Sequence, residues 1–248
     1  MIRNRLTGWA ILILTMAVIG VAQAAEGVKG RWGAGGFVGY HAPLFKLSDR
    51  FSSKVNKYGL NVSYVPGVKA TIEVEYHWAR FDHGALETKP FTWGPTKLNY
   101  VSPNASYTMK FTSLVMNGLI HVRKTRTMEA HTFSPYIAVG AGFYDYTARS
   151  RGVLWPGQSE LDAVKAGGGK DAQGKQIPAV LMNPAEDTQT ALTASLGFGL
   201  ESFITNSVAL DIRGRYSFII GELRPFDDWK LQKVFPIQLL DLSAGIKF

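Results

Sequence analysis

The sequence predicts an all-β fold, an eight-stranded antiparallel transmembrane up-and-down β-barrel. Three observations predict it. Apolar residues alternate without a break with polar or small ones at the C-terminus, an export signal stands at the N-terminus, and short connections between the predicted strands alternate with long ones. From Leu240 to Phe248 every second residue is apolar and the residues between are polar or small, which is the two-residue period of a strand. A buried strand of a soluble sandwich also alternates, so the export signal favours the membrane barrel.

The first 24 residues predict a secretory signal peptide. Two arginines precede an apolar run over Trp9–Val21, and this run of about 13 residues is shorter than the roughly 20 that a membrane-spanning helix needs. Ala22–Ala24 follows as a small-x-small cleavage pattern. An uncleaved anchor is the alternative, and the short run disfavours it. We therefore expect a signal peptide over 1–24 and an outer-membrane β-barrel domain over 25–248.

The composition excludes several classes of protein. Although 46% of the residues are hydrophobic, they are spread at every second position rather than gathered into a membrane helix. The absence of cysteine means that stability must come from the fold without disulfides. The net charge of +8 becomes 8 − 2 = +6 without the two signal arginines, and this excess suits membrane lipid and lipopolysaccharide. We expect no nucleic-acid partner, since export removes the chain from nucleic acid.

Eight alternating segments predict the strands. They are Arg31–His41, Lys57–Val65, Lys69–Phe81, Tyr107–Arg123, Ser134–Tyr146, Ala191–Phe203, Ser207–Ile220 and Phe235–Phe248. The short connections between them are Pro66–Val68, Lys124–Phe133 and Thr205–Asn206, and the long ones are Ala42–Asn56, Asp82–Ser106, Thr147–Thr190 and Gly221–Val234. Short periplasmic turns that alternate with long extracellular loops are typical of outer-membrane barrels, and the even strand count predicts that both termini are periplasmic.

The alternation assigns each strand an inward and an outward face. The first strand turns Gly33, Gly35 and Gly39 inward, the second Gly59, Asn61 and Ser63, and the third Thr71, Glu73, Glu75 and His77. On the third strand Ile72, Val74, Tyr76 and Trp78 therefore face lipid. The fourth strand alternates clearly from Leu114 to Val122 but blurs around Lys110. A bulge or an early exit from the bilayer would explain this irregularity.

The later strands follow the same rule. The fifth turns Gly140 and Gly142 inward, the sixth Gly197, Gly199 and Glu201, the seventh Asp211, Arg213, Arg215 and Ser217, and the eighth Asp241 and Lys247. The inward glycines have two interpretations. They let the strands bend in a tight barrel, or they leave a pocket or lateral gap for a small solute.

The chain resembles the small outer-membrane barrels of Gram-negative bacteria, the OmpA/OmpX/OmpW-like group. The resemblance lies in the opening strand Trp32–Tyr40, in Pro135–Gly142 and in the closing Ala244–Phe248. It implies that Phe248 is an assembly signal read by the barrel-assembly machinery. It also implies an integral outer-membrane protein with a structural role, or one with narrow passage of small, including hydrophobic, solutes.

Ten charged residues are predicted to form a network in the lumen. They are Arg31, Lys69, Glu73, Glu75, Glu201, Asp211, Arg213, Arg215, Asp241 and Lys247. An eight-stranded barrel is only wide enough for side chains or one small ligand. Charges in so narrow a tube are costly unless they pair, so the balanced signs favour a plug over a charged conduit.

We expect neither an enzyme nor a metal or cofactor site. Some barrels of this architecture modify lipid A, which requires a histidine beside a serine, but the sequence has no His-x-Ser triplet and its five histidines lack strong ligand spacings. The alternative function is a surface-interaction or adhesion barrel that binds a partner through its long loops. Of these, Thr147–Thr190 is the longest.

Overall fold

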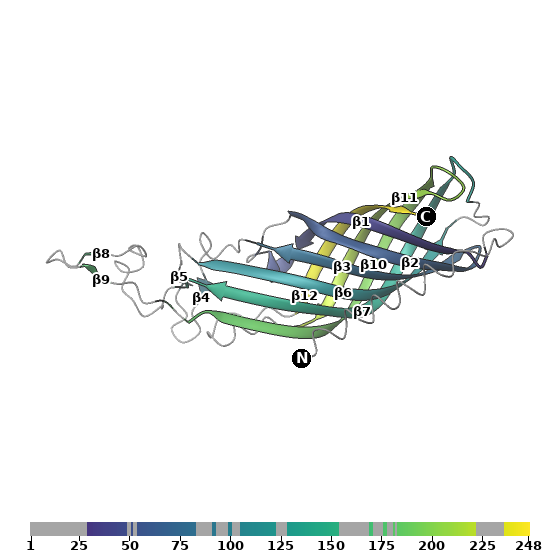
Figure 1. The fold of residues 1–248 in the computed structure, drawn as a ribbon. Helices are drawn as coiled ribbons and strands as arrows, with labels where there is room; N and C mark the ends of the chain where they lie inside the picture. The colour runs from purple at the N-terminus through teal and green to yellow at the C-terminus, as the bar shows by residue number, and fades with distance from the viewer. Residues whose placement is uncertain are drawn as a thin grey trace.

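Eight strands close into one antiparallel barrel in the computed structural model of the chain (Figure 1). They are β1 (Trp32–Pro43), β2 (Lys54–Gly67), β3 (Ala70–Phe81), β6 (Ser106–His121), β7 (Phe133–Arg151), β10 (Ala185–Phe203), β11 (Ala209–Ile220) and β12 (Ile237–Lys247). Short strand pairs β4 (Phe91–Thr92) with β5 (Asn99–Tyr100) and β8 (Gly169–Lys170) with β9 (Gln176–Ile177) form two small separate sheets, and Phe45–Leu47 is a 3₁₀ turn.

The structure describes residues 29–48, 51, 54–82, 91–92, 99–100, 105–122, 128–153, 169–170, 176–177, 181, 183–221 and 236–248. The predicted signal peptide over 1–24 lies outside the described residues. The described residues contain no helix of the length and apolarity that crossing a membrane requires.

The barrel closes between its first and last strands. β1 pairs with β12 from Gly35 opposite Lys247 to Pro43 opposite Leu239, and Phe248 N donates to the Ala34 carbonyl at 2.8 Å. Every barrel strand therefore has a neighbour on both sides. The backbone N–H and C=O groups can thus form hydrogen bonds between strands, which is necessary because hydrocarbon offers no hydrogen-bond partners. The predicted fold class is confirmed.

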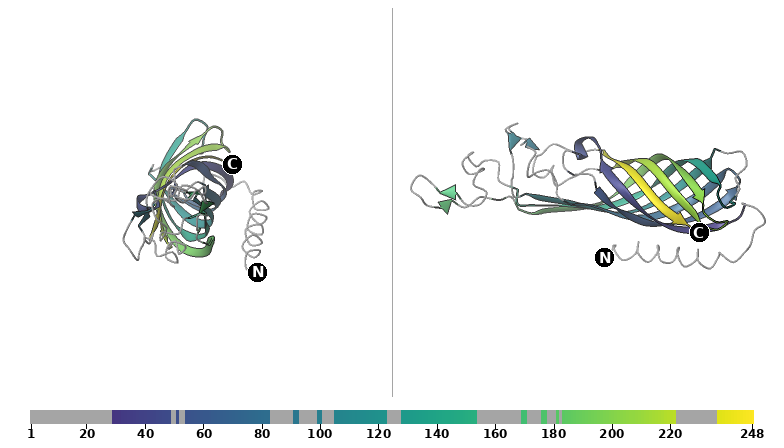
Figure 2. Two further views of the ribbon diagram at one scale, coloured as in Figure 1. Left: turned by 90° about the vertical axis from the view of Figure 1, so that its left-hand side faces the viewer. Right: turned by 90° about the horizontal axis from the view of Figure 1, so that it is seen from above.

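The connections divide the barrel into two ends. We call the end with the β2–β3, β6–β7 and β10–β11 connections the turn end, and the opposite end the loop end. β1 starts and β12 finishes at the turn end (Figure 2). That the turn end faces the periplasm stays a prediction.

The side-chain alternation produces an apolar outer band. On β7 the outward residues from Phe133 to Phe143 are apolar, and these two rings are 50% and 54% exposed. About ten residue steps of about 3.3 Å give about 33 Å along the strand, which a tilt of about 40° reduces to about 25 Å along the axis. This height matches the apolar band of an outer-membrane barrel.

Three strands continue past this band at the loop end. β6, β7 and β10 are longer than their neighbours and project beyond them (Figures 1 and 2). The predicted strand ends at Tyr146 and Ala191 were wrong, because β7 runs to Arg151 and β10 starts at Ala185. The sequence alternation weakens there because its polarity inverts. Thr147 and Arg149 face outward, while Tyr146 and Ala148 are buried inside.

The same inversion explains the irregular fourth predicted strand. The expected bulge at Lys110 was wrong, since β6 keeps one register with β3 from Met109 to Ile120 and with β7 along its whole length. Lys110 faces outward and is exposed, and Met109 and Phe111 are buried inside. The polar exterior agrees with the other expectation, an early exit of β6 from the bilayer.

Candidate functional site

A buried charged network crosses the centre of the barrel interior. Its members, all at most 8% exposed, are Lys57, Glu73, Glu75, Glu201, Asp211, Arg213, Arg215, Asp241 and Lys247. They come from strands β2, β3, β10, β11 and β12. In each strand either the odd-numbered or the even-numbered residues face inward, and we call this the inward parity of the strand. The network residues lie inside because each has the inward parity of its strand.

Two arginines of β11 hold the centre of the charged network. Arg213 donates to Glu73 at 2.6 and 3.1 Å and to Asp211 at 3.0 Å. Arg215 forms a two-pronged contact with Glu75 at 2.9 and 2.7 Å. Such paired N–H···O contacts are the strong form of an ion pair, because the planar guanidinium matches the carboxylate.

Two lysines extend the network towards the two ends of the barrel. Lys247 Nζ lies 2.9 Å from Glu73 and 3.1 Å from both Glu201 and Asp211. On the loop-end side, Lys57 Nζ lies 3.1 Å from Asp241 and 3.5 Å from Glu75. Within the part of the chain that the structure describes, no buried carboxylate of the network is without a basic partner.

The structure brings together eight of the ten predicted lumen charges and leaves two apart. Lys69 is exposed at the turn between β2 and β3, so it cannot join the network. Arg31 precedes β1 at the turn end, and among the described residues its Nη1 meets only the Met128 sulfur, at 3.7 Å. Both residues stand beyond the observed strands, where strand parity no longer fixes the direction of a side chain.

Sequence reasoning missed Lys57 and the aromatic partners of the network. Lys57 shares the inward parity of Gly59 and Asn61, which was the signal for it. Tyr136 donates to Asp211 at 2.5 Å and accepts from Arg213 Nε at 2.9 Å. Its parity on β7 equals that of the predicted inward Gly140, so the same rule could have found it.

Three buried histidines line the interior. His41 Nε2 lies 3.1 Å from Asp241, and His77 Nδ1 lies 2.7 Å from Glu75. His121 contacts Thr71 at 3.1 Å and Ser134 at 2.8 Å. Among the described residues, no three histidine, aspartate or glutamate side chains are arranged so that they could hold a metal ion.

The inward glycines make room for neighbouring side chains. A Cβ on Gly199 would lie 2.3 Å from the Tyr136 ring, and one on Gly140 would lie 2.2 Å from Asn117 Oδ1. Tyr136 and Asn117 are both buried. The space beside these two glycines is therefore filled, and it forms neither a pocket nor a lateral gap.

An apolar cluster closes the interior at the loop end. Its members include Leu47, Phe51, Phe81, Tyr107, Met109, Phe111, Tyr144, Tyr146, Ile219, Ile237 and Leu239, each at most 2% exposed. Phe51, from the β1–β2 connection, packs against Tyr107 and Phe81 with ring centroids 4.9 and 5.4 Å apart. Sequence patterning did not reveal this cluster. Most of its residues lie at the loop ends of predicted strands, where apolar residues take the inward positions expected for polar ones, and Leu47 and Phe51 lie in the predicted connection Ala42–Asn56.

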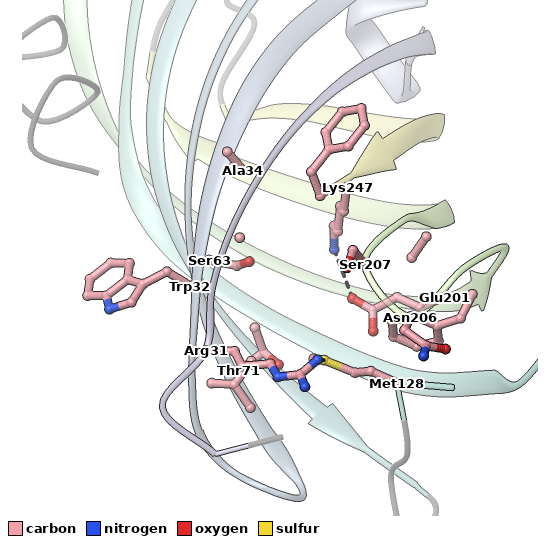
Figure 3. A pocket seen from close by; sticks show the side chains of 15 residues that line it. Arg31, Trp32, Ala34, Ser63, Thr71, Met128, Glu201, Asn206, Ser207 and Lys247 are labelled. Carbon is pink, nitrogen blue, oxygen red and sulfur yellow. Dashed lines mark hydrogen bonds and ion pairs between the residues drawn. The ribbon is translucent and has the colours of Figure 1, made fainter. Parts of the chain in front are cut away.

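A pocket of about 270 Å³ opens at the turn end, below the charged network (Figure 3). Val65, Phe203 and Ala209 supply apolar walls, and all three are nearly inaccessible to solvent. The Lys247–Glu201 ion pair lines it on the network side. The interior thus has three levels: this turn-end pocket, the charged network and the apolar cluster.

Comparisons with known proteins agree with this architecture. A family model described as "Outer membrane protein beta-barrel domain" matches residues 11–234. None of the curated proteins matches the chain. A solved major outer membrane protein from Thermus thermophilus is 9% identical, with 88% of this chain and 97% of that chain covered and a TM-score of 0.51.

Two further solved structures are similar at lower TM-scores. Neisserial surface protein A is 15% identical, with 87% of this chain and 95% of that chain covered and a TM-score of 0.41. The outer membrane protein W of E. coli is 13% identical, with 89% and 98% covered and a TM-score of 0.39. Identities this low describe the fold alone.

Proposed function

The chain belongs to the outer membrane protein β-barrel domain family and resides in the outer membrane of a Gram-negative bacterium, and we propose that it is a structural barrel with a closed lumen. The charged network is the observation that carries the proposal. Five carboxylates and four lysine or arginine side chains fill the centre of the barrel and are at most 8% exposed. A conduit would need these groups in contact with water, not with one another.

The energetics of the network support a permanent closure. Removing one partner of a buried ion pair costs about 3–5 kcal/mol, because the remaining charge stays buried and uncompensated. Arg213 and Arg215 each contact more than one carboxylate. Opening a path along the axis would break several such contacts at once. The apolar cluster at the loop end adds a second barrier to ions.

Planar-bilayer recording of the purified protein tests this proposal. We expect no unitary currents from folded protein, whose insertion is checked by heat-modifiable gel migration. A large porin recorded in the same membranes verifies that the assay detects open channels. Discrete, reproducible currents from the unmodified barrel would refute the closed lumen. Their loss in an Arg215→Gln variant would then identify the network as the conducting path.

A surface-interaction role is the second candidate. The three-stranded extension of β6, β7 and β10 favours it, because its outer face is polar and charged where the barrel has left the apolar band. Arg149 and Glu186 pair there at 2.9 Å, and both are largely exposed. Adhesion of bacteria that display the protein to cultured cells tests this role. Deleting residues 154–180 should lower adhesion while leaving the barrel folded, and unchanged adhesion would contradict it.

We propose no enzymatic activity. A lipid-modifying histidine must reach the outer leaflet, whereas His41, His77 and His121 are buried in the interior with polar partners. Among the other two, His131 is exposed at the turn end and His83 lies outside the described residues. Incubation with lipopolysaccharide followed by mass measurement of lipid A tests this, and any change in acyl content would contradict it.

A further inference from the structure

We infer that the turn-end pocket is a binding site for a small carboxylate that carries an apolar group. This inference is independent of whether the lumen conducts. It starts from Arg31, whose side chain lines the pocket together with Met128 (Figure 3). The guanidinium carries five N–H donors, and the thioether sulfur of Met128 at 3.7 Å is its one acceptor in the described part of the chain.

A thioether is a weak acceptor for a cation. Guanidinium groups prefer two-pronged contacts with carboxylates, in which two N–H groups donate to two oxygens. The two arginines of the charged network, Arg213 and Arg215, have such partners. Arg31, at the turn end, has no such partner among the described residues, and it is partly buried at a cavity rather than extended into solvent.

The charged side chains that line the pocket besides Arg31 are already paired with each other. Lys247 Nζ donates to Glu201 at 3.1 Å, and the main-chain oxygen of Phe248 accepts from Ala34 N at 3.1 Å. Among the described residues that line the pocket, Arg31 is therefore the cation that can accept an anionic ligand. This selects an anion that binds at the mouth of the pocket.

The walls and the volume select the rest of the ligand. Val65, Phe203 and Ala209 are at most 6% exposed and form an apolar surface beside Arg31. A water-sized group takes up about 30 Å³. The cavity of about 270 Å³ therefore has room for the roughly eight non-hydrogen atoms of hexanoate. The carboxylate would bind Arg31, and the alkyl chain would lie against the apolar walls and displace water from them.

A titration with hexanoate tests the inference on full-length folded protein in lipid nanodiscs. The readout is the ¹³C-labelled methyl group of Met128, observed by NMR, because this residue lines the pocket. We expect a saturable shift of the Met128 methyl signal, with the signals of Met109 and Met116 unchanged. Met109 is buried in the apolar cluster and Met116 faces outward, so both report that the barrel stays folded.

Two variants and a neutral probe isolate the contribution of charge. Arg31→Gln should weaken hexanoate binding by about tenfold or more, the loss expected for a charged hydrogen-bonded contact. Lys69→Gln removes the same charge at the same end of the barrel, from an exposed side chain outside the pocket, and should bind like the unmodified protein. Hexanol should bind about tenfold more weakly than hexanoate.

Three results would overturn the inference. One is the absence of a saturable Met128 shift up to about 10 mM hexanoate, a limit weaker than specific binding requires. Another is an Arg31→Gln variant that titrates like the unmodified protein. The third is equal binding of hexanol and hexanoate, which would show that the pocket takes any apolar chain.

Discussion

Neutralising Glu75 should strongly destabilise the barrel. Its carboxylate accepts hydrogen bonds from Nη1 and Nη2 of Arg215 at 2.9 and 2.7 Å. It also lies 3.5 Å from Lys57 Nζ. In a Glu75→Gln variant, Arg215 keeps one longer contact, with Asp241 at 3.5 Å, and stays 3% exposed. A buried charge that loses its partner costs about 3–5 kcal/mol, and we expect a loss of that size in the free energy of unfolding.

The double variant Glu75→Gln/Arg215→Met makes this prediction specific. Both members of the pair lose their charge, so no uncompensated arginine remains, and Lys57 keeps its 3.1 Å contact with Asp241. The double variant should therefore be more stable than the sum of the two single effects predicts, with a coupling of about 1–3 kcal/mol.

Urea unfolding in lipid vesicles, followed by heat-modifiable gel migration, measures these stabilities. Glu186→Gln serves as the matched control, because it neutralises a glutamate in the exposed ion pair with Arg149. Surface pairs contribute little to stability, so this variant should unfold like the unmodified protein. A Glu75→Gln variant that also unfolds like the unmodified protein, or additive effects of the two interior substitutions, would contradict the prediction.

Three further predictions test the packing and the position of the membrane, all by the same unfolding assay. Phe51→Ala should cost about 3–5 kcal/mol, because a ring 2% exposed would leave a cavity in the apolar cluster; a loss below about 1 kcal/mol would contradict the packing. Val139→Arg should cost about 2–4 kcal/mol, because this outward residue lies in the apolar band, whereas Thr147→Arg should cost little, and equal costs would contradict the band. Gly199→Ala should cost about 1–3 kcal/mol, because its Cβ would lie 2.3 Å from the Tyr136 ring; unchanged stability would show that Tyr136 has room to move.

Parity along each strand carried most of the sequence prediction. It placed Glu73, Glu75 and Arg213 in the interior and Trp78 outside, because a strand that separates lipid from a polar lumen must alternate without exception. The contacts among the interior residues were beyond its reach. Which carboxylate meets which arginine depends on the stagger between strands, and a single sequence does not state that stagger.

The prediction failed where the surroundings of a strand change. Beyond Phe143, β7 is still a strand, but its outward residues become polar and its inward residues apolar. A rule that expects apolar residues outside reads this stretch as a loop. Arg31 and Lys69 were misplaced for a related reason, because both stand just outside a strand.

The inversion along β7 also fixes the depth at which the barrel sits in the bilayer. A shift of the barrel towards its turn end would draw Asp145 and Thr147 into hydrocarbon, and a shift towards its loop end would lift Phe143 into water. Both displacements are unfavourable, so the change from apolar to polar residues on the outer face of β7 marks the level of the membrane surface. Where the bilayer is thicker or thinner than this barrel, the lipid should deform to meet the protein, because the protein itself cannot slide to accommodate the mismatch.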